Sequence, residues 1–150
     1  WSQDDLSVVE VAVKKMHRHH LDLQSLQSLR AEIRILARVS CPQIVSFHGA
    51  SWDQPPNVCI VMELVKGGSL EELIHGSYQV EVDNDEKFGI AIDVARGLAY
   101  LHAFTPAPII HRDVKPANVL LDPEFNAKLA DLGEARFVTS DVKLGGPVLR

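Results

Sequence analysis

The stretch IIHRDVKPANVLLD, residues 109–122, contains several polar side chains of the kinds that carry out chemistry. A run of eight residues within it supplies His111, Arg112, Asp113, Lys115 and Asn118. Apolar residues flank the run on both sides, which predicts a short loop between two buried strands. Loops held by a rigid scaffold are frequent positions for catalytic and binding residues. The segment is therefore a candidate active-site loop, and the elements around it must indicate its chemistry.

A second candidate group lies near the start of the chain. In SVVEVAVKK, three valines point to one side, while Glu10, Ala12 and Lys14 point to the other. This alternation predicts a strand that carries a lysine on the same face as a small alanine.

A third candidate is a carboxylate on a predicted helix. From about Gln24 to Val39, apolar residues recur with a helical period, and Pro42 is expected to end the helix. Glu32 falls on the apolar face, where a buried carboxylate needs a cation. The alternative is an edge position from which Glu32 reaches water.

The remaining elements follow from alternation, glycines and caps. IVSFHGAS and NVCIVMELV predict a hairpin around the turn WDQPPN, and KGGSLEELI predicts a flexible joint followed by a short helix with a Ser69–Glu72 capping box. A longer helix opens at Asp83 with Glu86, and NVLLD pairs with AKLADLG around the turn PEFN. The long helix is apolar on several sides and is expected to be buried: Phe88, Ile92, Ala95, Leu98 and Leu101. The order of these elements predicts two lobes around a hinge, and the cleft between lobes is a common ligand site.

Composition sets the outer bounds. The chain has 150 residues, 46% apolar content and a net charge of −5, which fits one globular domain and offers no basic surface for nucleic acid. No apolar stretch is long enough to span a membrane. Cys41 and Cys59 lie in apolar contexts and are interpreted as two small buried hydrophobes rather than a disulfide. The histidine-rich connector KKMHRHH is interpreted as a solvated loop, with metal binding as the weaker alternative.

Taken together, these motifs resemble those of eukaryotic protein kinases. VAVK, a helix with Glu32, IVMELVKGGSL, HRDVKPAN and ADLG occur in the order and spacing of that family and cover nearly the whole chain. The resemblance implies an α+β, two-lobed protein-kinase-like fold with a small β-rich N-lobe containing one helix and the start of a helical C-lobe. It also implies ATP and Mg²⁺ as cofactors and a protein substrate with a serine or threonine acceptor.

The resemblance assigns a role to each polar group. Lys14 would hold the nucleotide phosphates and pair with Glu32. Asp131 and Asn118 would ligate magnesium, and Asp113 would accept the proton of the substrate hydroxyl. Lys115, in DVKPAN, resembles the loop lysine of serine/threonine kinases.

The nucleotide base and the regulation of the site are assigned in the same way. Ala12 and Leu120 would line the adenine pocket, Met62 would gate its back, and the backbone of Glu63 and Val65 would bind the adenine. Arg112 resembles the arginine that pairs with a phosphorylated activation loop. Thr139 and Ser140 are the candidate phosphorylation sites, or else ordinary loop hydroxyls. The family's apolar column between the lobes would consist of Leu36, Phe47, His111 and Leu132.

The sequence also departs from the family. DLG replaces the commoner DFG, Gly146 stands where a threonine is often found, and neither a glycine-rich phosphate loop nor an APE segment is present. We therefore expect an internal piece of a kinase domain, incomplete at both ends, with the N-lobe at 1–65 and the first part of the C-lobe at 66–150. We also expect the isolated piece to be a poor enzyme.

Two alternatives remain open at this point. The first is a pseudokinase or signalling scaffold, which commonly lacks one of the catalytic residues that are present here. The second is a related small-molecule phosphotransferase, in which the loop would more often read His-Gly-Asp. The connector HAFTPAPIIHRD and the segment GGPVLR resemble the tyrosine-kinase-like group, whose members mostly phosphorylate serine and threonine. The expected location is the cytoplasm or the cytoplasmic side of a membrane protein.

Overall fold

The computed structural model describes residues 8–15, 23–51, 58–76 and 81–138. Four of the features predicted above lie outside these ranges: the histidine-rich connector, the turn WDQPPN, the candidate phosphorylation sites Thr139 and Ser140, and Gly146.

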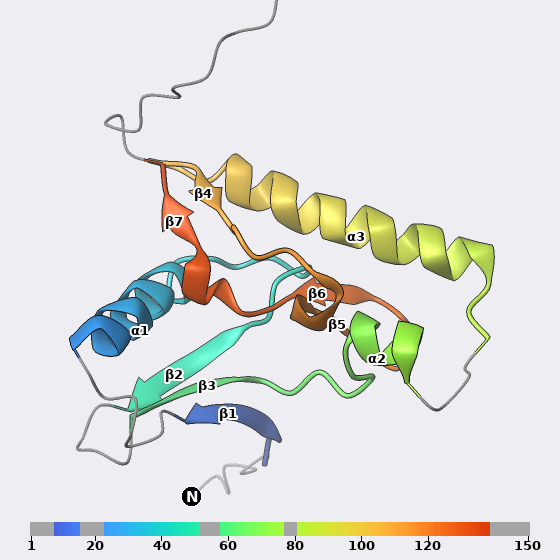
Figure 1. Ribbon diagram of the computed structural model, residues 1–150, viewed down its shortest axis with the longest axis horizontal. Coiled ribbons are helices and arrows are strands. Elements are labelled where there is room, and N and C mark those ends of the chain that lie inside the picture. Colours follow the sequence, from blue (N-terminus) through green and yellow to red (C-terminus); the bar gives the residue numbers. More distant parts are fainter. Residues whose placement is uncertain (1–7, 16–22, 52–57, 77–80, 139–150) are drawn as a thin grey trace, which may run out of the picture.

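A three-stranded antiparallel sheet forms the first part of the fold (Figure 1). Its strands are β1 (Val11–Lys15), β2 (Phe47–Ser51) and β3 (Cys59–Glu63), in the order β1-β3-β2. Ala12 pairs with Met62 and Lys14 with Ile60. Because cross-strand partners share a face of the sheet, Lys14 lies on the same face as the fully buried Ile60. The predicted strand and hairpin are confirmed.

Helix α1 (Leu23–Leu36) supplies the remainder of this part. The predicted end at Val39 is wrong: the helix ends three residues earlier, where Arg38 and Val39 both donate to the Ile35 carbonyl in a turn. Pro42 is therefore not the residue that ends it. The buried face holds Leu29, Glu32, Ile35 and Leu36.

The joint between the two parts contains Gly67 and Gly68, which were predicted to be a flexible connection. The structure shows instead that this joint is docked on strand β5 (Val119–Leu121). The Gly67 amide donates to the Leu121 carbonyl at 2.8 Å, and the Leu121 amide donates back to the Gly68 carbonyl at 2.8 Å. A Cβ at Gly67 would lie 2.5 Å from the Leu121 carbonyl oxygen, and Gly68 has a φ of +81°, so both positions require glycine for geometric reasons.

The second part is built on helices α2 (Leu70–His75) and α3 (Asn84–His102). Both predicted capping boxes are present: Ser69 with Glu72 on α2 and Asp83 with Glu86 on α3. In each box, the side chain of the cap residue accepts a hydrogen bond from the backbone amide of the glutamate three residues later. The carboxylate of that glutamate accepts a hydrogen bond from the backbone amide of the cap residue.

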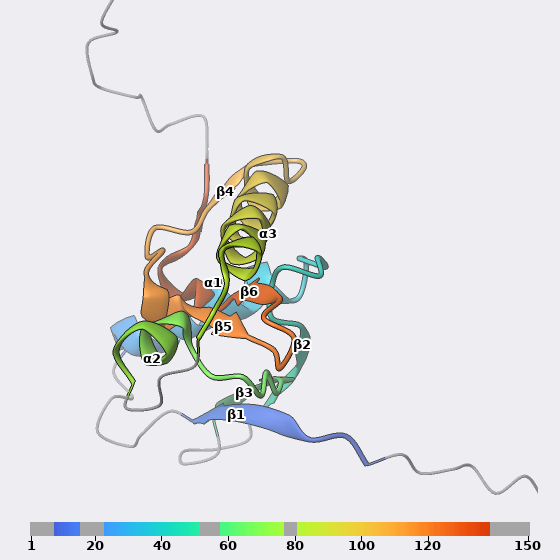
Figure 2. The same ribbon diagram turned by 90° about the vertical axis from the view of Figure 1, so that its right-hand side faces the viewer.

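The prediction that α3 is buried on several sides is wrong for part of its surface. Phe88 is 68% exposed and Ile92 is 49% exposed, whereas Ile90, Gly97 and Leu101 are buried. The reason is that only one side of α3 packs against the hairpin of strands β5 and β6 (Ala127–Leu129). The end-on view along α3 shows this hairpin beneath the helix (Figure 2).

Short strands and 3₁₀ turns position the candidate loop. Strand β4 (Ile109–Ile110) pairs with β7 (Arg136–Phe137), and β5 pairs with β6 (Ala127–Leu129). The turn η2 (Pro116–Asn118) forms the end of the loop, and η3 (Leu132–Glu134) begins within the ADLG motif. The sheet with α1 and the second, helix-rich part give the predicted two-lobed α+β arrangement.

Two further expectations can be compared with the structure. Cys41 and Cys59 are free, as predicted, but both are half-buried rather than buried. Among the helices of the described ranges, none has the length and apolar character needed to cross a membrane.

Candidate active site

Three charged side chains from three separate elements meet at the inner face of the sheet. The Lys14 ammonium on β1 lies 2.9 Å from Glu32 Oε1 on α1 and 2.9 Å from Asp131 Oδ1, just before η3. The side chain of Glu32 is only 5% exposed, but those of Lys14 and Asp131 are 39% and 47% exposed. The cluster is therefore anchored in the core and open to solvent on one side. The predicted buried position of Glu32 is confirmed, and the alternative that it reaches water is wrong.

The pKa values of this cluster follow from burial and from the ion pairs. Burial raises the pKa of Glu32, and its pairing with Lys14 only partly offsets this. Burial alone would lower the pKa of Lys14, but its bonds to the two carboxylates raise it overall. Burial of Asp131 is outweighed by the Lys14 hydrogen bond, so the pKa of Asp131 is lowered. At neutral pH, Lys14 is therefore a cation and Asp131 an anion.

Two residues of the site adopt left-handed backbone conformations. Asp131 has a φ of 54°, and Arg112 has a φ of 71°. A non-glycine residue in this region costs roughly 1–2 kcal/mol, and such strain is typical of functional sites. The motif alone did not indicate that either residue would be strained.

The candidate loop brings Asp113, Lys115 and Asn118 together. Lys115 Nζ lies 2.7 Å from Asp113 Oδ2. The Asn118 side-chain amide donates to the same carboxylate oxygen at 2.8 Å and to the Asp113 carbonyl at 2.9 Å. Chiefly because of the Lys115 hydrogen bond, the pKa of Asp113 is lowered. Asp113 is therefore an ionised acceptor whose orientation is fixed by two neighbours.

His111 links this loop to the ADLG segment. It is 1% exposed, and its Nε2 lies 3.1 Å from the Ala130 carbonyl. A carbonyl oxygen only accepts, so Nε2 carries the proton and Nδ1 is free to accept from the Asp113 amide at 3.4 Å. Burial lowers the pKa of His111, which keeps the ring neutral. The histidine is thus a structural connector, as the sequence predicted.

The residues predicted to surround the nucleotide base lie on both sides of the joint. Ala12 and Met62 are cross-strand partners on one side, and Leu120 on β5 lies on the other, bridged to Ser69. All three are half-buried. The Glu63 amide donates to the Ser46 carbonyl, so only its carbonyl is left to contact an adenine. Half-buried Val65 follows, just before the docked glycines.

The side chain of Glu63 has a role that the sequence did not predict. Its Oε1 accepts from the Ser46 amide at 2.6 Å and lies 3.1 Å from Lys128 Nζ on β6. These hydrogen bonds outweigh partial burial and lower the pKa of Glu63. Glu63 thus connects the three-stranded sheet to the hairpin of strands β5 and β6. Lys128 alternates with buried residues on β6, but no motif marks it as a partner of Glu63.

Two predicted groups are only partly described. Arg112 is exposed, and the hydroxyls predicted to engage it after phosphorylation lie outside the described residues. In the proposed column, Leu36, His111 and Leu132 are buried, and Phe47 packs against the same core. Helix α1 also packs on η3. Continuous stacking of the four side chains stays a prediction.

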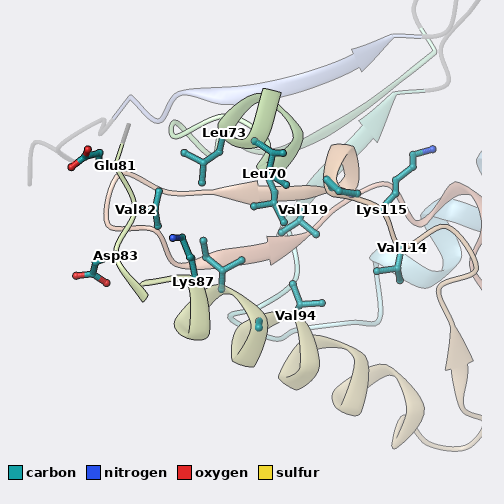
Figure 3. Close-up of a pocket in the computed structure, with 14 residues that line it drawn as sticks. Leu70, Leu73, Glu81, Val82, Asp83, Lys87, Val94, Val114, Lys115 and Val119 are labelled. Carbon is teal, nitrogen blue, oxygen red and sulfur yellow. The ribbon is translucent and has the colours of Figure 1, made fainter. Parts of the chain in front are cut away.

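A cavity of about 1100 Å³ lies beside this site, between α2, α3 and residues of the candidate loop (Figure 3). Its wall is mainly apolar and includes Leu70, Val94 and Val119. Lys115 also lines it, but its ammonium points away from the cavity (Figure 3). The cavity therefore borders the active-site loop without containing the Lys14 cluster.

The oxygen donors of the site fit magnesium. Asp131 offers an ionised carboxylate, and Asn118, whose amide nitrogen is bound to Asp113, offers its side-chain oxygen. Magnesium usually keeps several waters and takes one or two protein ligands together with substrate phosphates. Within the described ranges, no group of three or more His, Cys, Asp or Glu side chains could hold a metal. This pair therefore fits an ion shared with a nucleotide, not a self-contained metal site.

Comparison with known proteins gives a consistent result. The protein kinase domain profile matches residues 4–148. The serine/threonine-protein kinase TNNI3K of Mus musculus is 43% identical over 109 residues, which cover 73% of this chain and 13% of that protein. The serine/threonine-protein kinase CTR1 of Arabidopsis thaliana is 38% identical over 132 residues, 87% of this chain and 16% of that protein. The calmodulin-binding receptor-like cytoplasmic kinase 1 of Arabidopsis thaliana is 36% identical over 132 residues, 88% of this chain and 28% of that protein. The chain thus spans a small part of the length of these relatives.

Proposed function

This chain belongs to the protein kinase family, and on that premise we propose that it is the core of an ATP-dependent kinase acting on serine and threonine hydroxyls of proteins. The observation that carries the proposal is the cluster of Lys14, Glu32 and Asp131. Lys14 lies between the buried carboxylate of Glu32 and the solvent-exposed carboxylate of Asp131. The groups that would bind phosphate and metal are therefore already assembled.

Each group in the cluster has a distinct part in binding. Glu32 fixes the Lys14 ammonium, which would bind the phosphates of the nucleotide. Asp131 and Asn118 would hold Mg²⁺ with those phosphates. Bound Mg–ATP supplies the transferable phosphoryl group and the cation that neutralises its charge. Ala12, Met62, Leu120 and the backbone of Glu63 and Val65 would contact the adenine.

Asp113 and Lys115 would act on the acceptor. The lowered pKa of Asp113 makes it a weak base, which favours orientation of the hydroxyl and late acceptance of its proton. Lys115, paired with Asp113, would neutralise charge on the transferring phosphate. A lysine at this position is the feature that supports serine and threonine over tyrosine, and the names of the relatives agree with that choice.

The pseudokinase alternative is less well supported. Lys14, Glu32, Asp113, Asn118 and Asp131 are all present, and hydrogen bonds or ion pairs connect them as two groups. A small-molecule phosphotransferase is disfavoured by Arg112 and by the docked glycine joint.

The test is a phosphorylation assay with a peptide library containing serine, threonine and tyrosine. It is run on the 150-residue chain and on the longest product of its gene. We expect Mg-dependent labelling of serine and threonine, lost in Asp113→Asn. Labelling confined to tyrosine would contradict the proposed specificity. A folded protein that binds Mg–ATP but labels nothing under any condition would favour the pseudokinase.

A further inference from the structure

Arg136 makes two hydrogen bonds to the turn η3, which begins within the ADLG motif. Its Nη1 donates to the Gly133 carbonyl at 3.0 Å and to the Ala135 carbonyl at 2.7 Å. The turn, η3, is only three residues long, and the Ala135 amide donates back to the Leu132 carbonyl. Carbonyls at the end of so short a turn lack partners within it, so Arg136 supplies what the turn itself cannot.

The turn that Arg136 closes lies directly against the charged cluster. A Cβ at Gly133 would lie 3.2 Å from Asp131 Oδ1 and 3.6 Å from Glu32 Oε2. A backbone hydrogen bond from Gly133 is also one of the contacts that lower the pKa of Asp131. Gly133 therefore touches the Asp131 carboxylate on one side and accepts from Arg136 on the other.

The backbone of Arg136 is itself fixed relative to the active-site loop. It lies on β7, where it pairs with Ile110, the residue that precedes His111. The amide of Val138 continues this pairing by donating to the Pro108 carbonyl at 2.8 Å. Arg136 thus connects the strand that leads into Asp113 to the turn that holds Asp131.

We propose that Arg136 is a positioning residue that holds Asp131, through Gly133, in the orientation required to bind the metal of a bound nucleotide. This inference rests on the function proposed above. The strained backbone of Asp131, with its φ of 54°, gives the arrangement a physical reason. A strained conformation persists only where its surroundings fix it, and the Arg136 bonds fix the turn that follows.

The side chain of arginine suits this task. Both bonds come from one nitrogen, Nη1, whose two N–H donors are fixed in the plane of the guanidinium, whereas a lysine would have to place its ammonium with a flexible stem. We therefore expect Arg136→Lys to retain part of the effect and Arg136→Met to lose it. Arg34→Met is the matched control, because Arg34 is exposed on α1 and has no polar contact within the described part of the chain.

The experiment measures the affinity of ADP by calorimetry, with Mg²⁺ and with EDTA, for the longest product of the gene and its variants. The ratio of the two affinities is the gain due to the metal. Changing a residue that orients a metal ligand typically weakens metal binding about 10–100-fold, so we expect Arg136→Met to reduce the gain on the order of 10-fold. Its affinity in EDTA should match that of the unaltered protein, and Arg34→Met should preserve the gain.

The outcomes separate the inference from the proposed function. If the unaltered protein shows no gain with Mg²⁺, the proposed nucleotide site is wrong. If it shows a gain that Arg136→Met retains in full, the positioning role of Arg136 is wrong. Equal loss of affinity with and without metal would show a general structural role and would also overturn the inference. Thermal unfolding shows whether each variant is folded. If Arg136→Met does not fold, Arg136→Lys takes its place, and an undiminished gain with Mg²⁺ in Arg136→Lys overturns the inference.

Discussion

Replacing Lys14 with methionine removes the cation that faces a buried carboxylate. Methionine keeps most of the apolar stem of the side chain, so the change tests the charge more than the packing. Among the described residues, the Glu32 side chain, which is 5% exposed, then has no cationic partner and faces only the like charge of Asp131. Breaking a buried pair by removing one member is strongly destabilising, because the remaining charge is uncompensated.

Protonation of Glu32 removes the uncompensated charge in the variant. The free-energy cost of that protonation therefore sets the upper limit of the destabilisation. An ordinary glutamate has a pKa of about 4.3, and each pH unit above it makes protonation about 1.4 kcal/mol more costly. The penalty is therefore capped at about 3.7 kcal/mol at pH 7 and at about 1 kcal/mol at pH 5. The half-exposed pair with Asp131 adds only about 0.2–1 kcal/mol.

The sign follows from proton binding. Loss of Lys14 raises the folded-state pKa of Glu32 further above its unfolded value, so the folded state binds more protons than the unfolded state. The stability of the variant must then fall as the pH rises from about 4.3 towards the new pKa of Glu32.

Urea unfolding of the chain at pH 5 and pH 7 measures this difference. The set consists of the unaltered chain, Lys14→Met, Glu32→Gln, the double variant and Lys15→Met. Lys15 is the exposed neighbour on the same strand and controls for the loss of one positive charge. The double variant should recover much of the lost stability at pH 7. A penalty of Lys14→Met that is the same at both pH values would refute the reasoning.

Three further predictions concern other parts of the site. Asp131→Asn should weaken Mg–ADP binding, measured by calorimetry, because it removes a coordinating charge. Asp113→Asn should leave that affinity nearly unchanged and lower kcat about 10²-fold or more. The reverse pattern would show that the two roles are misassigned. Because burial lowers the pKa of His111, the folded state favours the neutral ring, so the free energy of unfolding should fall as the pH drops below about 6.5; in His111→Gln this part of the slope should vanish, and a slope that persists would point to another group. Gly67→Ala should displace the joint from β5, because the added methyl would lie 2.5 Å from the Leu121 carbonyl oxygen; adenosine affinity and melting temperature should both fall, and an unchanged protein would contradict the close approach.

Much of the fold could be predicted, because local sequence patterns indicate which segments form helices and strands. The alternation around Val11 and Val13, the helical period around Glu32 and the two capping boxes depend on residues that are close in sequence, and all are found in the structure. The exposure of Phe88 and Ile92 could not be predicted, because an apolar residue on a helix does not indicate which neighbour, if any, covers it. The end of α1 was predicted too late for a similar reason: the chain turns at Arg38 before Pro42 can act.

For the active site, the sequence by itself determined which groups are present and their order. The spacing of Asp113 and Asn118 already placed them in one loop, and the position of Glu32 on an apolar face already indicated either a nearby cation or an edge position that reaches water. The family resemblance already implied Lys14 as the partner of Glu32, but only the tertiary structure decided that Lys14 is shared between Glu32 and Asp131, each at 2.9 Å, since 18 and 117 residues separate Lys14 from these two partners. It also decided that Arg136 caps the turn beside Asp131 and that Glu63 binds Lys128. Such contacts depend on how strands, helices and turns pack in space, and a linear pattern of residue types does not specify the distances between them.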